Sequence, residues 1–178
     1  MAGEMENYFS HEQILLARQT FKEAELLTQR FFHVDEQERK QQRYDVKTRA
    51  FLEEHEISGN TFAHLCKYEL DKEPCENKEA IIFYRICLQD DVILDAVRRA
   101  DSFVRLPHLL LYIATHELVH VIRFERGEVD FYATGNERIR EEEIVHRTTG
   151  SLLRPRADID MNLVLECFSD QYRMRPFS

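Results

Sequence analysis

The strongest constraint on the fold of this chain is a nearly uninterrupted apolar segment between Leu106 and Arg126. It reads LPHLLLYIATHELVHVIRFER, in which Pro107 suits a first helical turn, and Gly127 after it suits a C-terminal stop. A helix that is apolar on almost every side is stable only when other elements surround it. We therefore expect one long helix here, at the centre of the hydrophobic core.

Length and composition indicate a single globular domain over residues 1–178, since 43% of the residues are hydrophobic and 32% are charged. The formal net charge of -9 argues against nucleic acid as a partner, because phosphate contacts require a surplus of Lys and Arg. We find no secretory signal and no window approaching the roughly 18 apolar residues of a membrane span. A cytoplasmic protein without a membrane partner is expected, and nothing indicates its oligomeric state.

The remaining pattern predicts a predominantly helical α+β domain with a small sheet. Ser10 and Gln13 form a capping box that begins a first helix, and apolar residues follow at helical spacing as far as Phe31. The charged segment 35–43 is either a solvated continuation of this helix or the loop that ends it. Further helices are expected over residues 60–70, from Asp90 onward, over 136–153 and over 161–168.

Two segments are predicted to be extended. Residues 81–88, reading IIFYRICL, have the β-branched and aromatic content typical of a strand. Residues 44–51 alternate loosely and suggest a shorter strand.

The cysteines are Cys66, Cys75, Cys87 and Cys167, and no two of them form a C-x-x-C pair. This spacing indicates neither a disulfide framework nor a zinc ribbon. We expect four ordinary thiols, each acting as a small buried apolar residue.

The central helix carries a pair of candidate metal ligands. His116 and His120 are four residues apart, so they stand on one helix face, one turn from each other, and both imidazoles can reach one zinc ion. A catalytic zinc site has three protein ligands and one water, so a third ligand is required.

The segment REEEIVH at residues 140–146 supplies the candidates for this third ligand. Glu142 is our first choice, because it falls on a helical stripe that includes Ile139, His146 and Leu153. Glu143 and His146 remain alternatives, and His146 could instead orient a ligand or touch the substrate.

The string His116-Glu117-Leu118-Val119-His120 matches the H-E-x-x-H motif and resembles that of the zincin metallopeptidases. With a downstream helical Glu as third ligand, residues 109–153 are similar to the gluzincins, such as thermolysin-like enzymes and the single-domain minigluzincins. The resemblance implies a zincin-like single domain, with a small sheet packed against the helix of the active site.

The same resemblance implies roles for individual residues. Glu117 corresponds to the glutamate that activates the zinc-bound water, and Tyr132 lies in the stretch where thermolysin-like enzymes have an assisting tyrosine. His146 stands where those enzymes have an Asp, one turn after the third ligand. Arg123 and Arg126 occupy the positions of the Gly and His of the metzincins, which excludes that branch.

We therefore expect a zinc-dependent peptidase acting on peptide or protein substrates. Tyr132, Arg123 or His146 would stabilise the oxyanion, although Arg123 is expected first of all to form an ion pair with a carboxylate. The strand at 81–88, if it is an exposed edge, would hold an extended peptide. The alternatives are a non-catalytic zinc module with a structural or protein-interaction role, and a hydrolase of a non-peptide amide.

Overall fold

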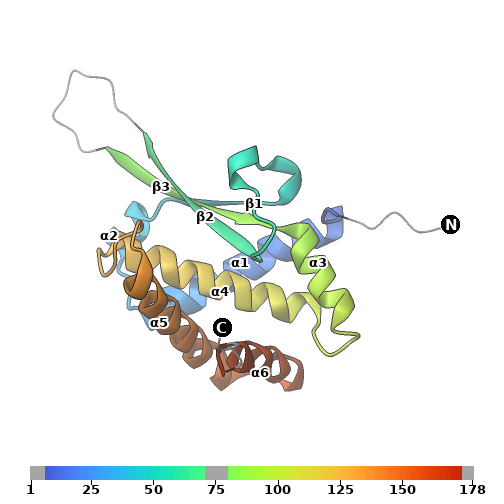
Figure 1. Cartoon of the computed structure of the whole chain (residues 1–178). Coiled ribbons are helices and arrows are strands. Elements are labelled where there is room, and N and C mark those ends of the chain that lie inside the picture. The colour runs from blue at the N-terminus through green and yellow to red at the C-terminus, as the bar shows by residue number, and fades with distance from the viewer. Residues whose placement is uncertain (1–6, 71–79, 174–178) are drawn as a thin grey trace.

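The computed structural model describes residues 7–70 and 80–173, which form a predominantly helical α+β structure with one three-stranded sheet (Figure 1). The helices are α1 (His11–Phe31), α2 (Glu36–Gln41), α3 (Asp90–Arg99), α4 (Leu106–Glu125), α5 (Gly135–Leu153) and α6 (Ile159–Arg173). The strands are β1 (Tyr44–Lys47), β2 (Ala63–Leu70) and β3 (Ile81–Leu88), and the 3-10 turns are Arg49–Phe51, Glu54–Glu56 and Arg154–Arg156.

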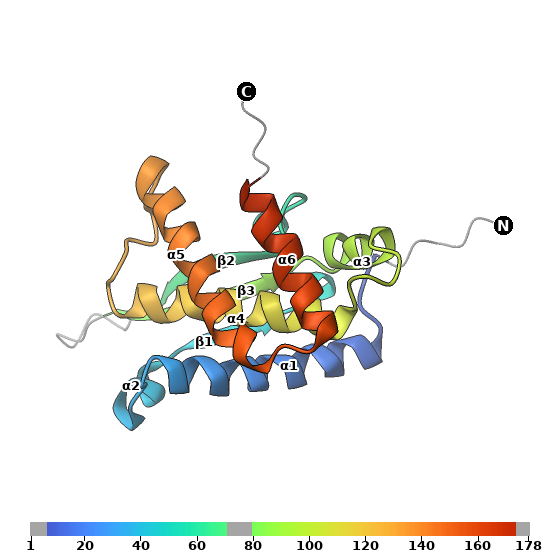
Figure 2. The ribbon, with the colours of Figure 1, turned by 90° about the horizontal axis from the view of Figure 1, so that it is seen from below.

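Helix α4 lies at the centre of these elements, as its apolar sequence predicts. The sheet covers one side of α4, α5 and α6 cross its other side, and α1 runs alongside it (Figures 1 and 2). Leu110, Ala114 and Val119 of α4 are fully buried. The helix ends before Gly127, whose φ of 65° lies in the left-handed region that favours glycine.

The sheet has the order β1-β3-β2, with β3 parallel to β1 and antiparallel to β2. Residues 81–88 form a strand as predicted, but this strand is central and does not meet the condition of being an exposed edge. Ile86 of β3 pairs with Val46 on one side and with Leu65 on the other, so both edges of β3 are occupied. Strands β1 and β2 are the two edges of the described sheet.

The helix predicted over residues 60–70 is wrong, since Ala63–Leu70 is strand β2. Ala63 and Leu65 pack against the core, whereas His64 between them is exposed. Residues 63–70 become a strand because they pair with β3 along its whole length. The helix-capping pattern at Asn60 is local and does not reveal β3 as a partner.

Smaller differences concern boundaries and burial. The charged segment after α1 forms a separate helix, α2, whose capping box is made by Asp35 and Glu38. The segment 44–51 divides into β1 and a 3-10 turn, and α6 extends beyond 161–168 at both ends. Cys87 is buried as expected, whereas Cys66 is only half-buried, Cys167 is exposed, and Cys75 lies outside the described residues.

None of the helices in residues 7–70 and 80–173 combines the length and apolarity needed to cross a membrane.

A charged network ties the turn before β2 to the sheet. Glu56 is fully buried and accepts hydrogen bonds from Tyr68 Oη, from Arg85 Nη1 at 2.9 Å and from the backbone N–H of Glu53 at 2.9 Å. Arg85 also donates to both carboxylate oxygens of Asp45. Burial alone raises the pKa of Glu56, but these donors outweigh it and lower the pKa to about 2.

We predict that Glu56→Gln lowers the free energy of unfolding at neutral pH by about 2 kcal/mol, because it removes a charge-assisted bond to Arg85. The folded pKa of about 2 lies below the ordinary value of 4.5, so the stabilisation is complete above pH 4.5 and is lost as the pH falls toward 2. Denaturant titrations between pH 2 and 7 measure this, with the exposed Glu54→Gln as control. Parallel pH profiles for wild type and Glu56→Gln would contradict the assignment.

Candidate metal centre

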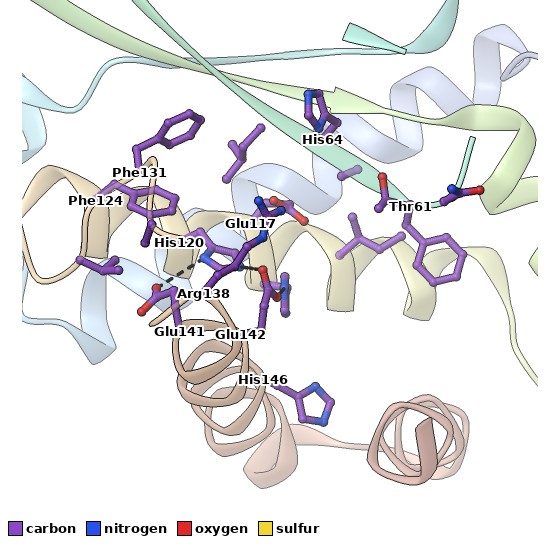
Figure 3. A pocket seen from close by; sticks show the side chains of 18 of the residues that line it. Thr61, His64, Glu117, His120, Phe124, Phe131, Arg138, Glu141, Glu142 and His146 are labelled. Atoms are coloured by element: carbon purple, nitrogen blue, oxygen red, sulfur yellow. Dashed lines mark ion pairs between the residues drawn. The ribbon is translucent and has the colours of Figure 1, made fainter. Parts of the chain in front are cut away.

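His116 and His120 project from the same face of α4, as their spacing predicts. Their ring centroids are 4.9 Å apart and the rings are steeply inclined, at 75°. Both side chains are largely buried, with 17% of His116 and 7% of His120 exposed. The two imidazoles therefore meet at one place on the surface that α4 turns toward α5. Figure 3 shows His120 facing Glu141 and Glu142 of α5.

Glu142 of α5 stands opposite the two imidazoles. Its carboxylate oxygens lie 3.5 Å from His116 Nε2 and 3.4 Å from His120 Nε2. One ligand atom from each of the three residues lies within 4.8 Å of the other two. Ligand atoms bound at about 2.0–2.1 Å to a tetrahedral ion are roughly 3.3 Å apart, so this spacing fits a shared cation better than a direct hydrogen bond.

Two imidazole nitrogens on the far side of the rings support this fit. Nδ1 of His116 and Nδ1 of His120 are both buried and make no hydrogen bond within the described residues. A neutral imidazole that carries its proton on Nδ1 presents the lone pair of Nε2, which is the atom that can bind a cation. The donor set of two imidazoles and one carboxylate could therefore hold a metal ion.

The charges around this cluster favour a cation. Burial lowers the pKa of His120, but the carboxylates of Glu141 and Glu142 outweigh burial and raise this pKa to about 9. Burial raises the pKa of Glu142, but the two imidazoles outweigh burial and lower this pKa well below its ordinary range. In both cases the negative charge of the glutamates attracts positive charge to the place where the rings meet.

Glu141 is a second carboxylate at this cluster, and sequence reasoning missed it. It is buried, and its Oε1 lies 3.5 Å from His120 Nδ1, on the side of the ring away from Glu142. Arg123 of α4 donates to both oxygens of Glu141, at 2.9 Å from Nε and 2.9 Å from Nη2, and also contacts Glu128. Glu141 is thus placed to orient the ring of His120, as carboxylates do beside many metal-bound histidines.

Of the two roles considered for Arg123, the role as an ion-pair partner is the one that the structure confirms. Its guanidinium is committed to Glu141 and Glu128, and Arg123 is not among the residues that line the cavity beside the cluster. The ion pair with Glu141 joins α4 to α5, and the ion pair with Glu128 joins α4 to the loop that follows it.

The positions of the three candidates for the third ligand distinguish Glu142 from the other two. Glu143 is exposed and lies outside the cluster. His146 lies one turn beyond Glu142 on α5, outside the group of mutually close ligand atoms, and its Nδ1 is hydrogen-bonded to Tyr112 Oη. His146 and Tyr132 both line the cavity, Tyr132 with 67% of its surface exposed.

A cavity of about 770 Å³ opens beside the cluster. The start of β2 forms one wall, α4 the floor, α5 the opposite wall, and the loop between α4 and α5 one end (Figure 3). Glu117 lies in this cavity next to the imidazoles, and burial raises its pKa. The cluster is thus open to a ligand on one side.

Three further lining residues were not identified from the sequence: Tyr112, Arg138 and His64. Tyr112 and Arg138 belong to α4 and α5, but only the packing of these helices shows which faces meet. His64 lies on β2, which was expected to be helical. The sequence did contain a signal for Glu141. Val145, Thr149 and Leu152 follow it at helical spacing and form a buried stripe with it, which is displaced by one residue from the stripe predicted through Glu142.

Comparisons with protein-family models, with curated proteins and with solved structures give no match for this chain.

We predict that the wild-type protein binds one divalent ion per chain and that Glu142→Ala lowers its affinity by at least about a hundredfold, because a direct ligand is lost. Glu143→Ala is the matched control, since Glu143 is exposed on the adjacent position of the same helix. Equilibrium dialysis with metal analysis measures both. Equal losses in the two variants would rule out this ligand set.

We predict that Glu141→Ala lowers metal affinity by about tenfold while the site remains, because His120 loses its orienting carboxylate. Glu128→Ala removes the other partner of Arg123 without touching His120, and metal affinity should not change. The same titration, with circular dichroism to verify folding, distinguishes the two. An unchanged affinity in Glu141→Ala would contradict the orienting role.

Proposed function

We propose that this protein is a zinc-dependent hydrolase of peptide bonds, with His116, His120 and Glu142 as the metal ligands. The observation that carries the proposal is the convergence of these three residues beside Glu117, on a cavity that is open to ligands. Two imidazoles and one carboxylate are a ligand set found in catalytic zinc sites. The proposal extends to the fold, which we infer to be zincin-like.

Bound zinc would supply Lewis acidity, which lowers the pKa of water and polarises a carbonyl. Glu117 follows His116 directly in α4, and its carboxylate lies in the cavity. It would accept a proton from the attacking water and later return this proton to the leaving amine. Helix α4 therefore carries the two histidine ligands and the base, whereas the third ligand, Glu142, comes from α5.

The edge of β2 supports an extended peptide as the substrate. Phe62, Ala63 and Leu65 line the cavity, and β2 pairs only with β3 within the described sheet. An extended peptide can add to such an edge by backbone hydrogen bonds, which places its carbonyl groups along the cavity. This assigns to β2 the role that the sequence suggested for residues 81–88.

His146 and Tyr132 are proposed to act on the developing oxyanion. The hydrogen bond with Tyr112 holds the ring of His146 at the α5 wall, whereas Tyr132 lies at the loop end of the cavity. Either side chain can donate a hydrogen bond to an oxygen that gains negative charge.

A non-catalytic zinc module is the main alternative. Structural zinc sites are normally closed by four protein ligands. The group found in the described residues has three, and the cavity adjoins them, which favours the catalytic proposal. The strand edge beside the cluster likewise favours a peptide over a non-peptide amide.

We predict that Glu117→Gln retains the metal but lowers the rate of peptide hydrolysis at least about a hundredfold, because it removes the general base. The exposed Glu143→Gln should retain both metal and activity. Metal analysis and mass spectrometry of a broad peptide library provide the two measurements. Undiminished hydrolysis by metal-loaded Glu117→Gln would refute the catalytic assignment.

A further inference from the structure

Arg138 is the one Lys or Arg among the described residues that line the cavity. It lies on α5, one turn before Glu142, and extends from this helix into the cavity (Figure 3). Arg138 is exposed and has no hydrogen bond or ion pair within residues 7–70 and 80–173. An arginine without a partner among the residues that the structure describes is notable in a chain with a formal net charge of -9.

The nearby carboxylates are engaged elsewhere. Glu141 is held by Arg123, and Glu142 faces the two imidazoles. Asp130 of the loop accepts a hydrogen bond from the backbone N–H of Tyr132 at 2.9 Å. The fourth acidic group of the cavity, that of Glu117, forms no ion pair with Arg138. The guanidinium is thus left to bind an incoming group.

Other features make the same end of the cavity attractive to an anion. Arg138 lies in the first turns of α5, and Thr134 at the N-cap, which also lines the cavity, makes no capping hydrogen bond with its side chain. The backbone N–H groups of this turn and the helix dipole favour negative charge. Lys67 adds a positive charge at 5.5 Å from the ring centroid of Tyr132, at the loop end of the cavity.

We propose that Arg138 selects substrates that carry a carboxylate close to the bond being cleaved. This inference rests on the proposed peptidase function and names the substrate class of that site. Arg138 and Glu142 are separated by about 6 Å along the helix axis, and residues of an extended peptide advance by about 3.3 Å each. The carboxylate therefore belongs within roughly two residues of the scissile bond, as an acidic side chain or as a free C-terminus.

The test compares matched peptides that differ only in this charge. One arm exchanges Asp and Glu for Asn and Gln near the cleavage site, and the other exchanges a free C-terminus for a C-terminal amide. Cleavage is measured with zinc-loaded wild type, Arg138→Gln, Arg138→Lys and the control Arg140→Gln, which removes an exposed arginine of α5 that does not line the cavity. Binding of the same peptides is measured in the Glu117→Gln background, where they are not consumed.

Wild type should prefer the carboxylate-bearing peptides by about three- to tenfold in kcat/KM, mainly through KM, which is the range for a partly exposed ion pair. Arg138→Gln should lose this preference and keep its activity on neutral peptides, Arg138→Lys should retain part of it, and Arg140→Gln should behave as wild type. The arm that shows the preference identifies the source of the carboxylate.

Two results would overturn the inference. If the wild type cleaves charged and neutral peptides equally, the proposed selectivity is contradicted, whereas the proposed function is unaffected. A preference that survives in Arg138→Gln would assign the selectivity to another group. Failure to cleave any peptide would instead count against the proposed function, and the binding measurements would then decide separately whether Arg138 discriminates between the peptides.

Discussion

The burial of α4 is the interaction on which the rest of the structure depends. This helix is apolar on nearly all sides, so the sheet, α1, α5 and α6 must assemble around it to remove its surface from water. Two imidazoles on one side of such a helix are then held in a largely dehydrated place. Their geometry follows from the backbone of a single well-packed element, which requires little adjustment when a ligand binds.

The contact between α4 and α5 converts this packing into a chemical site. Arg123 and Glu141 form the ion pair that joins the two helices, and the same carboxylate reaches Nδ1 of His120. Glu142, the next residue, faces the opposite side of the ring. Adjacent glutamates therefore perform different tasks, one fixing the helix contact and the ring, the other completing the donor set. The stability of the fold and the geometry of the site share this contact.

The position of the sheet gives the site its access. Because β3 is central, β2 is the edge that adjoins the imidazoles, and the space between β2 and α5 forms the cavity. The ion pair of the buried Glu56 with Arg85 joins the turn before β2 to the sheet, in a network separate from the ion pairs of α4 and α5. The cavity thus combines a rigid floor with walls from two elements that are distant in the sequence.

The sequence by itself determined the elements whose signals are local. The apolar run of α4, the pairing of His116 with His120, the capping box of α1 and the β-rich residues 81–88 all depend on spacing within one segment. Only the tertiary structure decided that residues 63–70 form a strand and that β3 is central. It also decided between Glu142, the first choice from the sequence, and Glu143, and it identified Glu141 and Glu128 as the partners of Arg123. Each of these depends on a partner far away in the chain, and no local pattern records which helix face or strand edge that partner will meet.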